Sequence, residues 1–586
     1  MSVPTVATPD ERRAALERAF APWQTRTFDE QFDHAVAKYA SRPYVISGDR
    51  VFTYADVQSR ARRFADGLAA LGVRPGDHVG LIMANYPEYA PIKLAIARVG
   101  AVAVPLNYLY RTQELGYVLA QSCCRVLITM TSFRDMDYQS MLDDLAPGWE
   151  RDGKTALGDL EFVITFAPDG ANERREGALD LTDLERIGAE SPGSAPGGLR
   201  RPDDPSDILY TSGTTGQPKG VMLSHDGLHR AAYGSLHCRA LPDGNRVVFA
   251  LPCYHLFAYG QAVLASVFVG GAMLPQPKFD PLEYFTAIER HRVTDVLAVP
   301  TMSVALVEHP ERNRFDLSSL RMMLSAAAVA PTWLWQRIRD ELGVAELVTA
   351  YGMTEMSGTM TMTRPEDPFD AITSTVGRPL PSGAAGLSRM NGVIAEYRVI
   401  DPVTGNEVPR EEVGELIARG PTTMKRYWNR PEDTAAMLRD GWMHSGDLVR
   451  FQADGSMVIA GRTKDLIKTG GELVMPKEVE DFLTGRPGVS QAYVVGIPDE
   501  RWGEVVGAFI VPEPNATVSV EDLSAVCRAE LSRFKVPRHI FLMDSGQIPQ
   551  TPTGKVQKFK LVPTAQRLIG SHTPLGITAS SITQGE

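Results

Sequence analysis

The sequence is poor in cysteine, in long apolar runs and in excess positive charge, and each shortage excludes a class of protein. Its 586 residues include five cysteines, with no CxxC pair and no metal-ligand spacing, so neither a disulfide-stapled secreted domain nor a zinc protein is expected. The longest apolar stretch, residues 262–274, is far shorter than the roughly 20 residues that cross a membrane. Lys and Arg number 60 against 71 Asp and Glu, a net charge of −11, which disfavours nucleic acid as the main partner.

What remains is an ordinary globular composition. Hydrophobic residues make up 44% and charged residues 22% of the chain, as in soluble globular proteins. A chain of 586 residues is too long for one hydrophobic core, so several domains are expected. Residues 1–12 carry Pro, Thr, Asp and Glu before any apolar run, which indicates no signal peptide. We therefore predict a cytoplasmic enzyme with reduced thiols.

Hydrophobic periodicity predicts strands that alternate with helices through most of the chain. Residues 52–74 carry apolar side chains at helical spacing after Thr53, a residue type typical of a helix N-cap. The other predicted elements are strands over 78–83, 101–105, 125–129 and 247–251 and a helix over 89–99. Such alternation is typical of parallel sheets with helices on both faces, so the predicted fold class is α/β with parallel or mixed sheets.

A smaller α+β unit is predicted at the C-terminal end. Its elements are helices over 478–483 and 520–533, strands over 492–495 and 508–511, and an apolar run over 539–543. We therefore predict a large N-terminal domain (1–464), a small mobile domain (465–568) and a tail (569–586). The tail is predicted to be disordered because Gly, Ser, Thr and Gln dominate it without a period.

Residues 210–220, Tyr-Thr-Ser-Gly-Thr-Thr-Gly-Gln-Pro-Lys-Gly, are the most informative run in the chain. The apolar pair Ile208 and Leu209 before it is typical of the end of a buried strand. Glycines let backbone N–H groups approach an anion, hydroxyls add donors, and Lys219 adds charge. The run is not a Walker A loop, because Lys219 precedes its glycine and no Gly-Lys-[Ser/Thr] end is present. It predicts a site for a polyphosphate.

With six further segments in order, this run resembles the adenylate-forming enzymes, the superfamily of acyl-CoA synthetases, peptide-synthetase adenylation domains and luciferases. The segments are 251–255 (Leu-Pro-Cys-Tyr-His), 325–328, 351–355 (Tyr-Gly-Met-Thr-Glu), 442–448 together with Arg462, 465–472, and 552–558 (Pro-Thr-Gly-Lys-Val-Gln-Lys). The resemblance covers nearly the whole chain and is strongest for the acyl-CoA ligases. It implies formation of an acyl adenylate and pyrophosphate from a carboxylic acid and Mg-ATP, followed by transfer to the thiol of coenzyme A with release of AMP.

The resemblance also implies residue roles around the nucleotide. The implied nucleotide-binding residues are Thr211, Ser212, Gly213, Thr214, Thr215, Gly216, Lys219, Ala326, Ala327, Ala328, Tyr351, Gly352, Met353, Thr354, Asp447, Arg462 and Lys555. Among them, Asp447 and Arg462 would hold the ribose. Glu355 and Thr211 would hold Mg²⁺, because Mg²⁺ takes oxygen ligands that it shares with phosphate. The implied catalytic residues are Lys555, Lys219, Glu355 and Thr354, with Lys555 bridging the acyl carboxylate and the α-phosphate.

Further roles concern the other substrates. Asp465 is implied as the hinge of the small domain, and the residues beside coenzyme A are Lys468, Gly470, Gly471 and Glu472. The acyl pocket is implied to include Tyr254, His255, Phe257 and Val299; their character favours an apolar acid, while a plain packing role for His255 stays open. The predicted partners are thus a small carboxylic acid, ATP and coenzyme A, with a homodimer as an open alternative.

Three positions depart from the family pattern. Ala326 replaces a glycine, Val329 replaces a proline, and Leu473 stands where relatives commonly carry a polar residue. Two related activities therefore stay open: thioesterification of a pre-made acyl adenylate, and transfer of the adenylate to a carrier protein. A catalytically silent nucleotide-binding protein is disfavoured, because the chain retains Lys219, Glu355, Asp447, Arg462 and Lys555 together.

Overall fold

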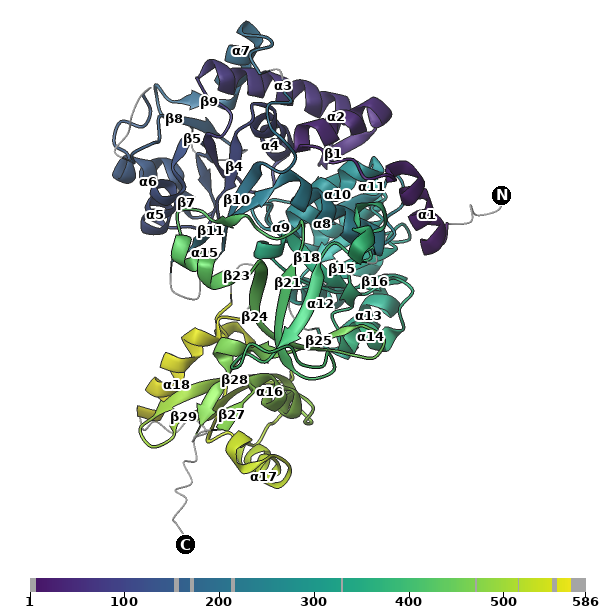
Figure 1. The fold of residues 1–586 in the computed structure, drawn as a ribbon, viewed down its shortest axis with the longest axis vertical. Coiled ribbons are helices and arrows are strands. Elements are labelled where there is room, and N and C mark those ends of the chain that lie inside the picture. Colours follow the sequence, from purple (N-terminus) through teal and green to yellow (C-terminus); the bar gives the residue numbers. More distant parts are fainter. Residues whose placement is uncertain are drawn as a thin grey trace. The chain divides into compact units, whose positions relative to one another are not determined.

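The computed structural model (Figure 1) describes residues 7–151, 157–168, 173–195, 197–211, 217–327, 330–390, 392–469, 472–514, 516–550 and 556–570. Its contacts divide the chain into two compact units. The first comprises residues 1–396 and 418–443, and the second comprises residues 397–417 and 444–586. The boundary predicted after residue 464 marks the point about which the small domain is expected to rotate. A division by contacts does not test that point, so the boundary stays a prediction.

An eight-stranded sheet in the first unit carries the strand that precedes the phosphate run. Its order is β22-β11-β10-β4-β3-β5-β8-β9. The strands are β3 (His78–Ile82), β4 (Val102–Pro105), β5 (Cys124–Met130), β8 (Phe162–Phe166), β9 (Leu179–Asp180), β10 (Pro205–Thr211), β11 (Lys219–Ser224) and β22 (Arg426–Tyr427). Strands β10, β4, β3, β5, β8 and β9 are parallel, whereas β11 runs antiparallel to its neighbours β10 and β22.

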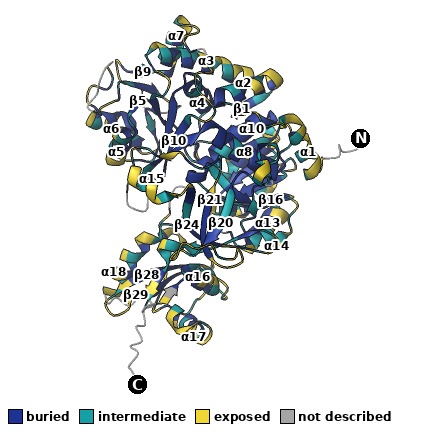
Figure 2. Ribbon diagram, in the orientation of Figure 1, coloured by how far each residue is buried: buried dark blue, intermediate teal, exposed yellow. Residues whose placement is uncertain are grey.

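Both faces of this sheet are covered. In β3, Val79 and Leu81 belong to one hydrophobic core, whereas Ile82 belongs to another. Because successive side chains of a strand point to opposite faces, this alternation means that packed side chains lie on each face. The second core contains residues from α5 (Thr112–Ser122) and α6 (Tyr138–Leu145). Figure 2 shows β5 and β10 as buried strands.

A seven-stranded sheet in the same unit carries the strands that precede the implied adenine and acyl residues. Its order is β16-β15-β14-β12-β13-β1-β2. The strands are β1 (Pro43–Ser47), β2 (Arg50–Thr53), β12 (Arg246–Phe249), β13 (Ala272–Pro275), β14 (Asp295–Ala298), β15 (Met322–Ser325) and β16 (Glu346–Val348). All pairs are parallel except β1 with β2.

The two helices predicted for the first unit, over 52–74 and 89–99, are present as α3 (Tyr54–Ala70) and α4 (Tyr89–Arg98), and α3 is shorter than predicted. Helix α3 has Thr53 as its N-cap, and Thr53 and Asp56 form a reciprocal capping box, which satisfies N–H groups that the first turn leaves unpaired. Helix α4 packs on α3 and on α2 (Phe28–Tyr39). Helix α8 (His225–Cys238) follows β11 and contacts α10 (Ala265–Val269) and β18 (Gly358–Met362). The prediction of an α/β fold with parallel and mixed sheets is confirmed.

The second unit contains two sheets. The first includes β20 (Glu396–Ile400), β21 (Gly414–Arg419), β24 (Trp442–Phe451) and β25 (Met457–Arg462), and the unit boundaries fall within β20, β21 and β24. The second has the order β27-β26-β29-β28, with β30 beside β29. Its elements are β26 (Ile467–Thr469), β27 (Glu472–Val474), α16 (Pro476–Thr484), β28 (Val489–Asp499), β29 (Gly503–Pro512), α17 (Val520–Glu530), β30 (His539–Leu542) and α18 (Leu561–Gly570).

The small α+β unit predicted from the sequence is present, with longer strands than expected. Strands β28 and β29 pair along their whole length, from Val489 opposite Pro512 to Asp499 opposite Gly503. Helix α18 ends at Gly570, two residues into the predicted tail, and residues 571–586 lie outside the described part of the chain.

Candidate nucleotide and acyl site

Strands β10 and β11 bring the two ends of the phosphate run together. Thr211 is the last residue of β10 and lies opposite Lys219, the first residue of β11. The buried strand predicted before the run is therefore β10, and the run connects two paired strands. Ser212, Gly213, Thr214, Thr215 and Gly216 lie outside the described residues.

The Lys219 ammonium lies between a carboxylate and an aromatic ring. Its Nζ forms an ion pair with Oδ1 of Asp433, a residue of α15 (Pro431–Met437), and lies 5.5 Å from the centre of the Tyr427 ring. The Lys219 and Asp433 side chains are 18% and 28% exposed. The charge is thus held on a partly open surface, where a further anion can reach it.

Glu355, implied as a metal ligand, lies buried beside the same tyrosine. It belongs to the 3₁₀ turn η3 (Thr354–Met356) and is 7% exposed. The Tyr427 hydroxyl donates to Glu355 Oε1 at 2.7 Å. Burial, followed by the charge of Glu355, raises the pKa of Tyr427 well above its ordinary value, so this hydroxyl stays protonated and donates. Tyr427 therefore joins the lysine and the carboxylate of the implied site.

The segment around Tyr427 is tied to both sides of the site through its backbone. Met424 N donates to Glu355 O at 2.8 Å, and Trp428 N donates to Gly220 O at 2.8 Å. Sequence reasoning missed Tyr427 and Asp433. The run Tyr-Trp-Asn-Arg-Pro at 427–431, aromatic and charged before a helix that begins with proline, was the pattern that could have drawn attention to them.

The Tyr-Gly-Met-Thr-Glu segment forms a strand and a turn. Strand β17 (Ala350–Met353) pairs antiparallel with β18, and Tyr351 lies opposite Thr361. A Cβ on Gly352 would lie 2.0 Å from the Gly358 oxygen, so only glycine allows this close approach. The turn η3 then presents half-buried Thr354 and buried Glu355. Strand β11 contacts η3, so the segment lies near the strand that carries Lys219.

The implied adenine segment follows β15 in an unusual conformation. Ala326 is buried and donates its N–H to Ala298 O at 3.3 Å, whereas Ala327 is exposed and has a φ of 74°. A left-handed conformation costs an alanine about 1–2 kcal/mol, so this backbone favours glycine. Ala328 and Val329 lie outside the described residues. Strained backbone at this point is typical of a ligand-binding segment.

The implied acyl residues follow neighbouring strands at one edge of the seven-stranded sheet. Tyr254, His255 and Phe257 come after β12, and Val299 comes directly after β14. Strand β14 pairs with both β12 and β15. Because parallel strands have their carboxyl ends on the same side of the sheet, these residues and Ala326 all follow strands at that side. The structure thus brings the implied adenine and acyl segments to one side of the sheet.

Tyr254 and His255 form an uncharged aromatic group. The Tyr254 ring is buried, 4.5 Å from the His255 ring and 5.2 Å from the Tyr108 ring between centres. Burial lowers the pKa of His255 to about 4, so the imidazole is neutral at physiological pH. Leu256 lies next to Gly358: a Cβ added to this glycine would be 3.5 Å from the Leu256 Cβ. The acyl segment therefore meets the residues that follow Glu355.

The two residues implied for the ribose form an ion pair within the second unit. Asp447 of β24 lies opposite Arg462 of β25, and Arg462 Nε is 2.8 Å from Asp447 Oδ1. The Asp447 side chain is 6% exposed and that of Arg462 is 35% exposed. The arginine orients a largely buried carboxylate through a charge-assisted bond, and the ribose-binding role of the pair stays a prediction.

Three further implied residues, Asp465, Lys468 and Glu472, lie in or near the hairpin that follows. Asp465 ends the 3₁₀ turn η6 (Thr463–Asp465), and exposed Lys468 and Glu472 stand on β26 and β27. Lys468 N donates to Glu504 Oε2 at 2.8 Å, which ties the hairpin to β29. Gly470, Gly471 and Lys555 lie outside the described residues.

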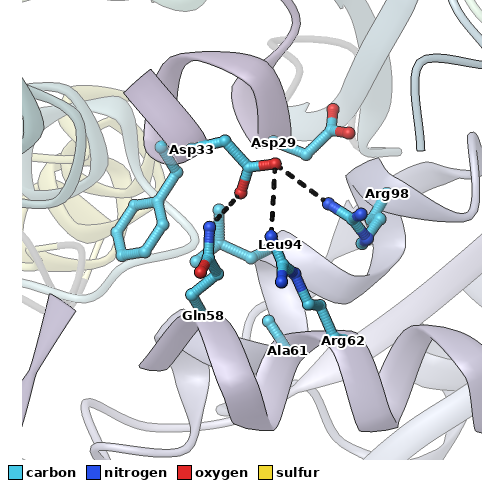
Figure 3. A pocket seen from close by; sticks show the side chains of 8 residues that line it. Asp29, Asp33, Gln58, Ala61, Arg62, Leu94 and Arg98 are labelled. Atoms are coloured by element: carbon cyan, nitrogen blue, oxygen red, sulfur yellow. Dashed lines mark hydrogen bonds and ion pairs between the residues drawn. The ribbon is translucent and has the colours of Figure 1, made fainter. Parts of the chain in front are cut away.

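A small pocket between α2, α3 and α4 has a structural explanation (Figure 3). Its cavity is about 10 Å³, room for about one water molecule. Asp33 accepts a hydrogen bond from Gln58 and pairs with Arg98 at 3.2 Å and Arg62 at 3.8 Å. The polar side chains around it therefore satisfy one another and hold the helices together.

Comparison with known proteins identifies the family. Residues 32–428 match the AMP-binding enzymes, and residues 478–555 match the C-terminal domain of AMP-binding enzymes. The chain belongs to the adenylate-forming superfamily, in its acyl-CoA ligase branch. The predicted family is confirmed, and the chain is an AMP-forming acid–thiol ligase that carries out ATP-dependent acyl-CoA synthesis with ATP and coenzyme A as substrates.

Relatives match along nearly their whole length. The putative acyl-CoA synthetase YngI of Bacillus subtilis (strain 168) is 34% identical over 543 residues, which are 91% of this chain and 96% of the relative. Feruloyl-CoA synthase of an Amycolatopsis species is 36% identical over 512 residues, 87% of this chain and 93% of the relative. The crystal structure of the anthranilate CoA ligase AuaEII with anthranoyl-AMP has a TM-score of 0.78 and 26% identity, covering 93% of this chain and 98% of that one.

Proposed function

We propose that this acyl-CoA ligase activates an apolar carboxylic acid as its adenylate and transfers the acyl group to coenzyme A, in the cytoplasm. The observation that carries the proposal is the joining of Lys219 and Glu355 through Tyr427. This arrangement supplies a cation for phosphate, on β11, and a buried carboxylate for a metal, on the neighbouring turn η3. The free thiols of the cysteines support a reducing compartment.

Residues of the site have distinct roles in the first half-reaction. Lys219 would stabilise phosphate charge, and Tyr351 with Ala326 would contact the adenine. Attack of the acyl carboxylate on the α-phosphate crowds negative charge, so positioning and charge stabilisation by Lys219 and Lys555 supply most of the catalysis. In the second half-reaction the coenzyme A thiol gives its proton to solvent, and its sulfur attacks the acyl carbonyl carbon; AMP leaves with the electron pair of the broken bond between that carbon and the bridging oxygen.

The residues present fit a magnesium ion. Among the described residues there is no group of three or more His, Cys, Asp and Glu side chains arranged for a metal. Mg²⁺ in nucleotide sites commonly takes one or two protein carboxylates and completes its shell with phosphate oxygens and water. Glu355, held by Tyr427, suits that role, and the Thr211 hydroxyl at the end of β10 adds an oxygen ligand. The ion would neutralise phosphate charge.

The acyl group is proposed to be apolar. Tyr254 and Val299 are buried, and His255 beside Tyr254 is uncharged because burial lowers its pKa to about 4. A charged acyl group would lose its hydration there without a counter-ion. The names of two relatives, feruloyl-CoA synthase and anthranilate CoA ligase, point to acids with a ring. Aliphatic and aromatic acids therefore both belong in the test.

The test is a pair of assays over a panel of acids. ATP–pyrophosphate exchange reports the first half-reaction, and thioester formation with coenzyme A reports the second. In a homologous series of aliphatic acids, each added methylene should raise kcat/KM about fourfold, or about 0.8 kcal/mol, until the pocket is full. Acetate as the best substrate would contradict the apolar pocket, and failure of every acid to support exchange would contradict adenylation.

A second candidate is thioesterification of a pre-made adenylate. It is favoured by Ala326 in place of the family glycine and by the left-handed Ala327 beside it, which alter the segment that would contact adenine. This candidate predicts thioester formation from a supplied acyl adenylate without pyrophosphate exchange. Transfer to a carrier protein is distinguished by replacing coenzyme A with that acceptor in the second assay.

A further inference from the structure

Asp433 is the residue of the site whose chemistry the proposed function does not use. It supplies a carboxylate to Lys219, although a phosphate-binding lysine is expected to have its charge available. We propose that the Asp433 carboxylate competes with the nucleotide polyphosphate for Lys219, weakening triphosphate binding and favouring departure of pyrophosphate. This inference rests on the proposed function.

The place of Asp433 is set by the start of its helix. Thr434 Oγ1 accepts from Tyr427 N at 3.0 Å and donates to Arg430 O at 2.7 Å. Arg430 Nη2 in turn donates to Gln217 Oε1 at 3.2 Å, beside the phosphate run. These bonds join the first turn of α15 to β22 and to the run. The Asp433 carboxylate is therefore held beside Lys219 by the fold.

The chemistry of the pair sets the direction of the effect. A lysine ammonium has three donors, so it can bind phosphate while it keeps one bond to Asp433. The carboxylate, however, neutralises the ammonium and repels a polyphosphate brought next to it. The pair is partly exposed, where a single ion pair typically changes an equilibrium by less than about tenfold. Removal of the Asp433 charge should therefore tighten triphosphate binding about three- to tenfold.

Competition for Lys219 through charge has one alternative, in which Asp433 holds the Lys219 side chain in the orientation that catalysis needs and does not weaken ATP binding. Asp433→Asn separates the two roles, because asparagine keeps the size and one oxygen acceptor, removes the charge, and replaces the second oxygen with an NH₂ donor. Glu432→Gln is the matched control: Glu432 is the exposed neighbour on the same helix, and its substitution makes the same change in net charge.

The experiment measures the dissociation constants of ATP and AMP by titration calorimetry, with the full-length protein. Asp433→Asn should bind ATP about three- to tenfold more tightly and AMP as the unsubstituted protein does, because the effect acts through phosphates beyond the first. Glu432→Gln should bind both nucleotides normally. In a Lys219→Met background, Asp433→Asn should no longer tighten ATP binding.

Several results would overturn the inference. If Asp433→Asn binds ATP more weakly, the carboxylate orients Lys219. If ATP binding is unchanged, the carboxylate is a surface charge with no effect on the nucleotide. Equal tightening of ATP and AMP, or persistence of the effect without Lys219, would exclude competition at this lysine. Failure of the unsubstituted protein to bind ATP would overturn the proposed function, and this inference with it. Asp433→Ala, expected to change ATP binding in the same direction, serves if the asparagine variant is unstable.

Discussion

At the scale of single residues, Tyr427 connects two charged groups that the sequence keeps far apart. Its ring lies 5.5 Å from the Lys219 ammonium, and its hydroxyl donates to Glu355 at 2.7 Å. A hydrogen bond to a metal-binding carboxylate orients that ligand, and loss of such a partner typically costs 10–100-fold in metal affinity. The contribution of this tyrosine should therefore be visible in the magnesium requirement.

The first prediction is that Tyr427→Phe raises the Mg²⁺ concentration for half-maximal pyrophosphate exchange by about tenfold or more. The ring and its contact with Lys219 remain, so the effect isolates the hydroxyl. The measurement is a Mg²⁺ titration at saturating ATP. Tyr117→Phe is the control. It also removes one tyrosine hydroxyl, but that hydroxyl accepts a hydrogen bond from Arg430, whereas the Tyr427 hydroxyl donates to Glu355. An unchanged Mg²⁺ requirement would show that Glu355 does not depend on Tyr427 for its role.

The second prediction concerns Lys555, which the family resemblance assigns to the first half-reaction. Loss of one preorganised charge contact with a developing anion costs about 3–4 kcal/mol, or ~10²–10³ in rate. Lys555→Ala should therefore lose pyrophosphate exchange by that factor and still convert a supplied acyl adenylate with coenzyme A. Lys558→Ala is the control, since Lys558 pairs with Glu480 at 2.6 Å. Equal loss of both half-reactions would remove Lys555 from its assigned role.

At the scale of elements, the ends of strands and short turns carry the implied functional residues. Thr211 and Lys219 stand at the paired ends of β10 and β11, and Val299 follows the carboxyl end of β14. Strand ends suit this purpose because the sheet holds them rigidly while their side chains stay open to a ligand. Asp465 stands on a different kind of element, the short 3₁₀ turn η6.

The third prediction is that Asp465 acts through its backbone. Proline fixes φ near −65° and removes the N–H, whereas alanine keeps the torsional freedom and loses only the carboxylate. Asp465→Pro should keep pyrophosphate exchange and lose thioester formation by orders of magnitude, while Asp465→Ala keeps both. Both half-reactions are measured on each variant. Thioester formation by the proline variant at the alanine level would move the pivot away from residue 465.

At the scale of the whole molecule, stability depends on histidines that the first unit buries without charge. Burial lowers the pKa of His229 and of His255 to about 4, and that of His225 well below its ordinary value. His229 lies between Phe28 and Phe268, 6.2 and 5.9 Å away between ring centres. In the unfolded chain a histidine titrates near 6.5, so below about pH 6.5 the unfolded state takes up protons that the folded state does not.

The fourth prediction follows from that difference. The stability contributed by these neutral histidines is complete above about pH 6.5 and is lost as the pH falls towards 4. Between pH 7 and pH 5, one such histidine should cost about 2 kcal/mol of unfolding free energy. His229→Gln should reduce the acid-induced loss by that amount, whatever its effect at neutral pH. The measurement is urea unfolding at pH 8, 7, 6 and 5. Equal loss in both proteins would exclude His229 as a source of acid sensitivity.

Much of the fold could be predicted from the sequence because its causes are local. Thr53 caps α3 because a hydroxyl and Asp56 satisfy the first N–H groups within one turn. Strand β10 is recognisable from its apolar residues before a Gly- and Thr-rich run. The fold class and the family depended on such short patterns and on their order. Strand lengths were less predictable, since β28 and β29 extend beyond their apolar centres by pairing with each other.

The arrangement of the site was decided only by tertiary structure. Asp433 pairs with Lys219 across 214 positions of sequence, and Tyr427 reaches Glu355 across 72. No local pattern specifies such contacts, because they depend on which strands of the sheet become neighbours and on where α15 begins. The sequence by itself determined the family, the α/β fold and most residue types of the candidate site. The fold determined which charges meet there, because packing brings together side chains that chain order separates.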